Sequence, residues 1–154
     1  MTIEETLRIA LEAHEGQKDL DGRPVVLHPV AVGLMGGNET EIKTGFLHDV
    51  VEDSDLTLEN LRSRGVDEDV LAALQLLTHS KTEDYFDYVR RIATSGNATA
   101  IHVKLNDLRH NLERGLRTYS QAVANGDTEK AERLTRINDK HRKALQIFED
   151  CGLL

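Results

Sequence analysis

The sequence predicts an all-α protein, a single helical domain spanning residues 1–154. Three observations favour this class. The chain contains only two prolines, it has few runs of β-branched residues, and its apolar residues recur at spacings of three and four, which places them on one face of a helix. A chain of this length is expected to form one domain. We see no internal repeat, linker or low-complexity tract, so the expected architecture is a helical bundle.

The first expected helix begins after Thr2, which can cap it, and runs to about His14. Residues 15–27 are rich in Asp and Gly and form an expected loop, with a loop or short hairpin arm near residues 18–27. His28-Pro29 opens the second helix, because proline suits the first helical turn. The run Gly36-Gly37-Asn38 ends that helix.

The rest of the chain also has helical patterns. A third helix is expected from about Thr40 through Asp53, followed by shorter ones over residues 57–63 and 67–78, with Thr57 and Asp67 as caps. Three more helices follow from three apolar sets: Tyr85, Phe86, Tyr88, Val89 and Ile92; Ala98, Ile101, Leu105, Leu108 and Leu112; and Leu134, Ile137, His141, Leu145 and Phe148.

Charge limits the partners that the protein can have. With 19 Lys and Arg against 27 Asp and Glu, the net charge is −8, which argues against nucleic acid and acidic membranes as partners. The charge is uneven: residues 1–103 hold 9 basic and 19 acidic residues, and residues 104–154 hold 10 and 8. No apolar run approaches the ~18–20 residues of a membrane span. The single cysteine, Cys151, cannot form an intramolecular disulfide, which fits a cytoplasmic protein.

The segment Phe46–Asp53 carries the most informative pattern. As a helix it places His48, Asp49, Glu52 and Asp53 within an arc of about 140°. One interpretation is an amphipathic helix with a solvated polar face. However, Asp49 and Asp53 are like charges at i, i+4, which repel each other. A bound divalent cation would remove that repulsion, and an imidazole beside a carboxylate suits Mn²⁺, Fe²⁺ or Zn²⁺.

Two adjacent residues cannot complete a metal site, so further ligands must come from elsewhere in the chain. His28, at the start of a helix, is one candidate. Asp107 is another, because it shares a stripe with Val103 and Asn111 on an otherwise apolar helix. Each could instead be a hydrogen-bonded residue of the core or its rim, and spacing alone leaves both alternatives open.

Several motifs occur in a fixed order: Ala13-His14-Glu15-Gly16-Gln17, Gly22-Arg23-Pro24 leading to His28-Pro29, Leu47 to Asp53, Leu77-Thr78 with Glu83-Asp84-Tyr85, and Val103 to Asp107 with His110-Asn111. This ordered set resembles the HD-domain phosphohydrolases. More closely, it resembles the hydrolase domain of the RelA/SpoT family in the form of a small stand-alone alarmone hydrolase. The resemblance spans about residues 5–148 and implies a single HD-domain helical bundle.

The resemblance also implies roles for individual residues. It implies one divalent metal, usually Mn²⁺, held by His28, His48, Asp49 and Asp107. It assigns Glu52 and Asp53 to water activation and proton transfer. The implied reaction is hydrolysis of the 3′-pyrophosphate of ppGpp or pppGpp, which yields pyrophosphate and GDP or GTP. Substrate contacts are expected from Lys18, Lys81 and Asn111.

The chain departs from the family pattern near the expected arm. Many alarmone hydrolases carry basic residues where this chain has Asp19-Leu20, and an aromatic residue where it has Val25. Two alternatives therefore stay open: a phosphohydrolase acting on another phosphorylated nucleotide, and a non-catalytic nucleotide-binding module. The oligomeric state is not predicted. The other histidines (His14, His79, His102, His110 and His141) are expected as capping, core or rim residues rather than ligands.

Overall fold

The computed structural model describes all 154 residues. It contains nine α-helices and no strands, as the sequence predicts. The helices are α1 (Ile3–Ala13), α2 (Leu27–Leu34), α3 (Glu39–Leu47), α4 (Val50–Asp53), α5 (Leu58–Ser63), α6 (Glu68–Leu77), α7 (Tyr85–Ala93), α8 (Ala98–Ala124) and α9 (Thr128–Asp150).

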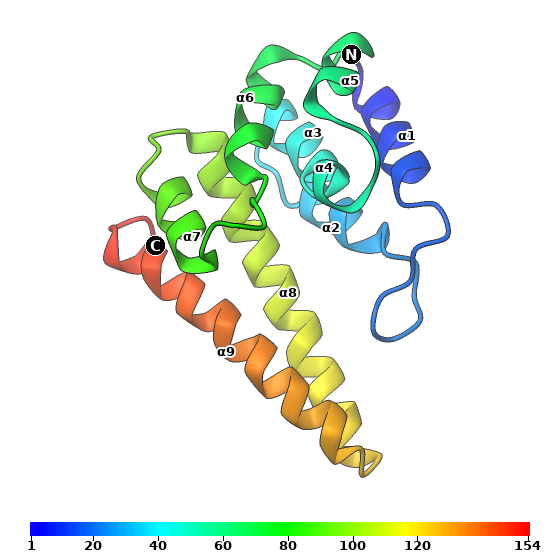
Figure 1. The fold of residues 1–154 in the computed structure, drawn as a ribbon, viewed down its shortest axis with the longest axis vertical. Coiled ribbons are helices and arrows are strands. Elements are labelled where there is room, and N and C mark those ends of the chain that lie inside the picture. Colours follow the sequence, from blue (N-terminus) through cyan, green and yellow to red (C-terminus); the bar gives the residue numbers. More distant parts are fainter.

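Figure 1 shows that α8 and α9 form a long antiparallel pair, with α1 to α6 gathered on one side of α8 and α7 beside α9. Two apolar clusters hold these parts together. The larger one joins residues of α2, α6, α7, α8 and α9, including Val32, Leu108 and Phe148. The smaller one joins α1, α3, α4, α5 and α6 around Leu47 and Leu74. No helix of the structure is long and apolar enough to cross a membrane.

Helices α2 and α3 approach closely because glycines face each other at their contact. A Cβ atom built on Gly45 would lie 2.6 Å from the Cα atom and 2.7 Å from the amide nitrogen of Gly33. Only glycine leaves room for two backbones at this distance. This contact fixes the separation of α2 and α3. Helix α2 carries His28, and α3 is followed by His48.

The single helix expected over residues 40–53 is wrong. Helix α3 ends at Leu47 and α4 begins at Val50, so His48 and Asp49 lie in the turn between them. The ring Nδ1 of His48 lies 2.7 Å from the carbonyl oxygen of Gly45, which a continuous helix would give to the Asp49 amide. The side chain thus competes with the backbone for this acceptor.

Two of the three expected N-caps form a capping hydrogen bond, and one does not. Thr2 and Thr57 cap α1 and α5 with their side chains, as predicted. Asp67 occupies the N-cap position of α6 but makes no capping bond. Its carboxylate instead accepts a hydrogen bond from Lys43 Nζ at 2.8 Å, which ties α6 to α3.

The segment between α1 and α2 is a short hairpin arm. Lys18 and Pro24 form an antiparallel bridge, and Asp19 Oδ1 accepts the amides of Asp21 and Arg23 at 2.8 and 2.9 Å. This Asx-type turn closes the arm locally. Helix α8 extends to Ala124, well beyond the Leu112 that ends the expected apolar pattern.

Candidate active site and metal centre

Four polar side chains from three parts of the chain converge beside α8. His28 Nε2 lies 2.9 Å from Asp107 Oδ1 and 3.9 Å from Asp49 Oδ2. His48 Nε2 lies 3.2 Å from Asp49 Oδ2 and 3.4 Å from Asp107 Oδ1. Ligand atoms of His28, His48 and Asp49 all lie within 4.8 Å of one another. The structure thus brings together every residue that the sequence analysis names as a metal ligand.

His48 is oriented for metal binding by its own hydrogen bond. Because the Gly45 carbonyl can only accept, Nδ1 of His48 carries the ring proton. Its Nε2 faces the Asp49 and Asp107 carboxylates at 3.2 and 3.4 Å and has no hydrogen-bond partner. Burial disfavours the charged ring, but these two carboxylates raise the pKa of His48 well above its usual value, so a cation at this point would take the place of a proton. The side chain is 4% exposed. A buried nitrogen without a partner is costly, and a cation between the two carboxylates would satisfy it.

Asp107 is held from two sides within α8. Its Oδ2 accepts from Lys104 Nζ and its Oδ1 from Asn111 Nδ2, both at 2.8 Å. Burial alone would raise the pKa of this carboxyl, but the Lys104 ammonium and the neighbouring histidines hold that pKa well below its usual range. Asp107 is therefore a carboxylate with a fixed orientation, as a metal ligand should be.

The second nitrogen of His28 contacts another histidine. His28 Nδ1 lies 2.7 Å from His110 Nδ1, and the two rings are stacked. Burial, followed by the nearby His28, lowers the pKa of His110 to about 4, so His110 is neutral at pH 7. If Nε2 of His28 bound a cation, Nδ1 of His28 would carry the ring proton and donate a hydrogen bond to Nδ1 of His110.

The donor set fits a divalent cation. Two imidazole nitrogens lie between 2.9 and 3.9 Å from two carboxylate oxygens, and this mixture suits Mn²⁺, Fe²⁺ or Zn²⁺. The orphaned Nε2 of His48 is an independent indication of a missing partner at that point. Of the four side chains, only Asp49 is appreciably accessible, at 26%, which leaves one side of the cluster open.

Glu52 and Asp53 belong to α4, one helical turn after His48 and Asp49. Burial raises the pKa of both carboxyls above the usual values, and the Asp49 charge adds to the shift for Asp53. Glu52 Oε1 accepts the amide of His79, from the loop that joins α6 to α7. The Asp53 carboxylate makes no hydrogen bond within the protein, while its backbone carbonyl accepts from Gln17 Nε2 at 2.7 Å.

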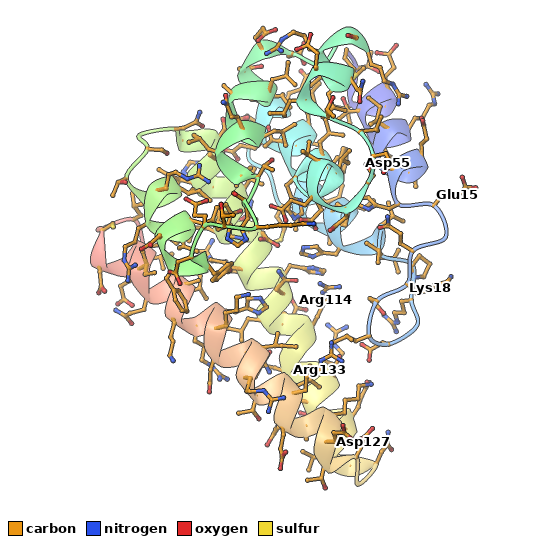
Figure 2. All side chains as sticks on the ribbon, in the orientation of Figure 1. Glu15, Lys18, Asp55, Arg114, Asp127 and Arg133 are labelled. Carbon is orange, nitrogen blue, oxygen red and sulfur yellow. The ribbon has the colours of Figure 1, made fainter.

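The three residues expected to contact a substrate are placed differently. Asn111 adjoins the cluster through Asp107, and its Oδ1 accepts from Arg114 Nη2 at 2.6 Å. Lys18 lies on the arm, which Figure 2 shows across from Arg114 of α8. Lys81 is an exposed residue of the α6–α7 loop, two positions after His79. The structure brings neither lysine into direct contact with the four clustered side chains.

The sequence analysis underestimated Lys104 and His110. It assigned no role to Lys104 and expected His110 only as a capping, core or rim residue, yet both contact the cluster. A signal for them was available. Lys104 precedes Asp107 by three positions and His110 follows it by three, so all three lie on one helix face.

No protein-family profile matches the chain. Individual relatives do. A Synechocystis sp. protein named probable guanosine-3′,5′-bis(diphosphate) 3′-pyrophosphohydrolase is 36% identical over 115 residues, covering 67% of this chain and 15% of its own length. The guanosine-3′,5′-bis(diphosphate) 3′-pyrophosphohydrolase MESH1 of Danio rerio is 40% identical over 67 residues, covering 38% of this chain and 37% of its own length. The chain therefore matches well under half the length of these relatives.

A solved structure supports the fold. That structure is described as "A metazoan ortholog of SpoT hydrolyzes ppGpp and plays a role in starvation responses". It superposes with a TM-score of 0.66 over 99% of this chain and 96% of its own, at 23% identity. The resemblance to RelA/SpoT-type hydrolases is thus confirmed, and the chain is a homologue of the guanosine-3′,5′-bis(diphosphate) 3′-pyrophosphohydrolases with the same all-α fold.

Proposed function

We propose that the chain is a metal-dependent pyrophosphohydrolase that converts ppGpp or pppGpp to GDP or GTP and pyrophosphate. The observation that carries the proposal is the convergence of two histidines and two aspartates beside a carboxylate pair. The relatives with this activity in their names favour the same substrate.

In this proposal His28, His48, Asp49 and Asp107 hold one divalent cation, and Mn²⁺ is the metal that we favour. The mixture of imidazole and carboxylate donors supports this choice over Mg²⁺, which prefers oxygen ligands. When bound, such a metal lowers the pKa of a coordinated water and offsets charge on phosphate oxygens.

Glu52 and Asp53 supply the proton transfers. Water attacks the phosphorus attached to the 3′ oxygen, the bond from that phosphorus to the 3′ oxygen breaks, and pyrophosphate leaves. The attacking water loses a proton and the departing 3′ oxygen gains one. In this proposal the unpartnered Asp53 carboxylate and the free oxygen of Glu52 accept and return that proton. Their raised pKa values bring both groups nearer to neutrality, which suits general acid–base catalysis.

The substrate is a small polyanion, so the site must offer local cations within an acidic protein. We propose Lys18, Lys81 and Asn111 as its contacts. Lys18 belongs to the α1–α2 arm and Lys81 to the α6–α7 loop, and Asn111 donates a hydrogen bond to Asp107. The local charge around the substrate, rather than the net charge of −8, then governs its attraction. We place this reaction in the cytoplasm, where an exposed free cysteine such as Cys151 stays reduced.

A panel of phosphorylated nucleotides, assayed with Mn²⁺ and with pyrophosphate release as the readout, tests the proposal. We expect turnover of ppGpp or pppGpp that excess chelator abolishes. Asp49→Ala and Asp107→Ala should lose both metal and activity, whereas Glu52→Ala should lose activity and keep the metal.

The same panel separates the alternatives. Cleavage of a different phosphorylated nucleotide, such as a nicotinamide nucleotide, would keep the chemistry and change the substrate. A folded, metal-loaded protein that cleaves no member of the panel would refute the proposal and favour a non-catalytic nucleotide-binding module. Full turnover in chelator would rule out the metal dependence.

A further inference from the structure

The arm between α1 and α2 is fastened to the α8–α9 pair by its own carboxylates. Asp21 Oδ2 accepts from Thr118 Oγ1 at 2.8 Å, and Asp21 Oδ1 lies 3.2 Å from Lys130 Nζ. Asp19 Oδ2 lies 3.8 Å from Arg114 Nη1. Two acidic groups of one arm therefore face cations of both long helices. The bond from Thr118 lowers the pKa of Asp21, so its carboxylate keeps its charge at neutral pH.

The arm forms a wall of two cavities, one of which borders the metal cluster. This cavity, of about 450 Å³, is lined by His28 and His110 and also by Arg23 and Arg117. The other, of about 120 Å³, is lined by Asn111 and His141. Leu20, Asp21, Arg114 and Thr118 line both cavities. A nucleotide that presents its 3′-pyrophosphate to the cluster can extend its remaining groups along this wall.

Most of the cations in these cavities already have acidic partners. Arg114 faces Asp19, Lys130 pairs with Asp21, and Arg117 pairs with Glu113 at 3.0 Å. Arg23 lines the larger cavity and has no acidic partner. The side chain of Asp19 is only 22% exposed, so its charge is poorly screened by solvent. The region distant from the metal cluster can therefore compensate only a small negative charge.

We propose, on the basis of the proposed function, that Asp19 and Asp21 are specificity-determining residues that disfavour additional phosphate on the 5′ side of the substrate. The enzyme then prefers ppGpp to pppGpp and binds GDP more tightly than GTP. If the added phosphate binds about 6 Å from one of these carboxylates, an effective dielectric between about 40 and 80 corresponds to about a three- to tenfold preference.

The test combines turnover with binding of the products. The kcat/KM values for ppGpp and pppGpp, and the Kd values for GDP and GTP, are compared in the wild type, Asp19→Asn, Asp21→Asn and Glu4→Gln. Asparagine at position 19 keeps the oxygen that accepts the amides of Asp21 and Arg23, so the arm keeps its turn. Glu4 is exposed on α1 and makes no ion pair, and Glu4→Gln therefore controls for the change in net charge.

We expect the wild type to favour ppGpp and GDP. Asp19→Asn should shift both ratios about three- to tenfold toward pppGpp and GTP, Asp21→Asn should shift them in the same direction, and Glu4→Gln should leave them unchanged. Equal ratios in the wild type and both arm variants, or a wild-type preference for pppGpp and GTP, would overturn the inference. If neither nucleotide is cleaved, the proposed function fails, and the GDP-to-GTP binding ratio still decides the role of the arm.

Discussion

Gly45→Ala should weaken metal binding although it replaces none of the four proposed ligands. The added methyl group would lie 2.6 Å from the Cα atom of Gly33, 2.7 Å from its nitrogen and 3.0 Å from the carbonyl carbon of Val32. All three atoms belong to the backbone of α2, so no side chain can rotate away. Helix α2 carries His28, and α3 leads directly into His48.

The size of the effect follows from these distances. Ordinary contact begins near 3.4 Å, so α2 must retreat by about 0.8 Å to admit the methyl group. Overpacking of this kind costs about 1–3 kcal/mol, and the better helix propensity of alanine returns about 1 kcal/mol. We therefore expect a loss of up to about 2 kcal/mol in the free energy of unfolding. Because metal ligands must be placed within about 0.2 Å, the affinity for Mn²⁺ should fall at least about tenfold.

Denaturant unfolding and calorimetric titration with Mn²⁺ measure the two effects. Gly37→Ala is the matched control, since its nearest neighbour is the side-chain atom Glu41 Oε2 at 3.3 Å, and this side chain can give way. The control should bind Mn²⁺ as the wild type does. A Gly45→Ala protein with unchanged Mn²⁺ affinity would refute the idea that the α2–α3 contact sets the ligand geometry.

Three further predictions concern buried charge. Lys104→Met leaves the Asp107 carboxylate without its ammonium partner. It should reduce the free energy of unfolding by about 3 kcal/mol and the Mn²⁺ affinity by about 10- to 100-fold, and saturating Mn²⁺ should recover part of the stability in thermal melts. Burial raises the pKa of Asp53, so its ionisation opposes folding above that pKa; the stability of Asp53→Asn relative to the wild type should increase from pH 4 to pH 7 in the metal-free protein, and a constant difference would contradict this. Burial lowers the pKa of His141 to about 4, so the wild type should lose stability as the pH falls from about 6.5 toward 4, and His141→Leu should reduce that loss; identical pH profiles would exclude a contribution from this residue.

The periodic patterns predicted the class and order of the helices because each helix buries an apolar face. They could not predict the break at His48, since it depends on a side-chain bond to the Gly45 carbonyl. Nor could they show that Asp67 would pair with Lys43 instead of capping α6. In both cases a tertiary or local polar contact competes with a backbone preference that the sequence expresses clearly.

The candidate site likewise has residues that the sequence predicted and residues that it did not. Motif order placed His28, His48, Asp49 and Asp107 in one site, and the structure brings them together. The supporting contacts of Lys104 and His110 depend on rotamers and on helix packing. The ion pairs of the arm with Arg114 and Lys130 could not be predicted either. They join residues about a hundred positions apart, and no local sequence pattern indicates such pairs.

Titration of the metal-free protein with Mn²⁺, with paramagnetic resonance of free Mn²⁺ as the readout, tests the central claim most directly. We predict one tight site per chain in the wild type and in Glu52→Gln, and its loss in His48→Ala and Asp107→Ala variants that remain folded. Tight binding that persists in both of those variants, or no binding in the wild type, would contradict a metal centre built on this cluster.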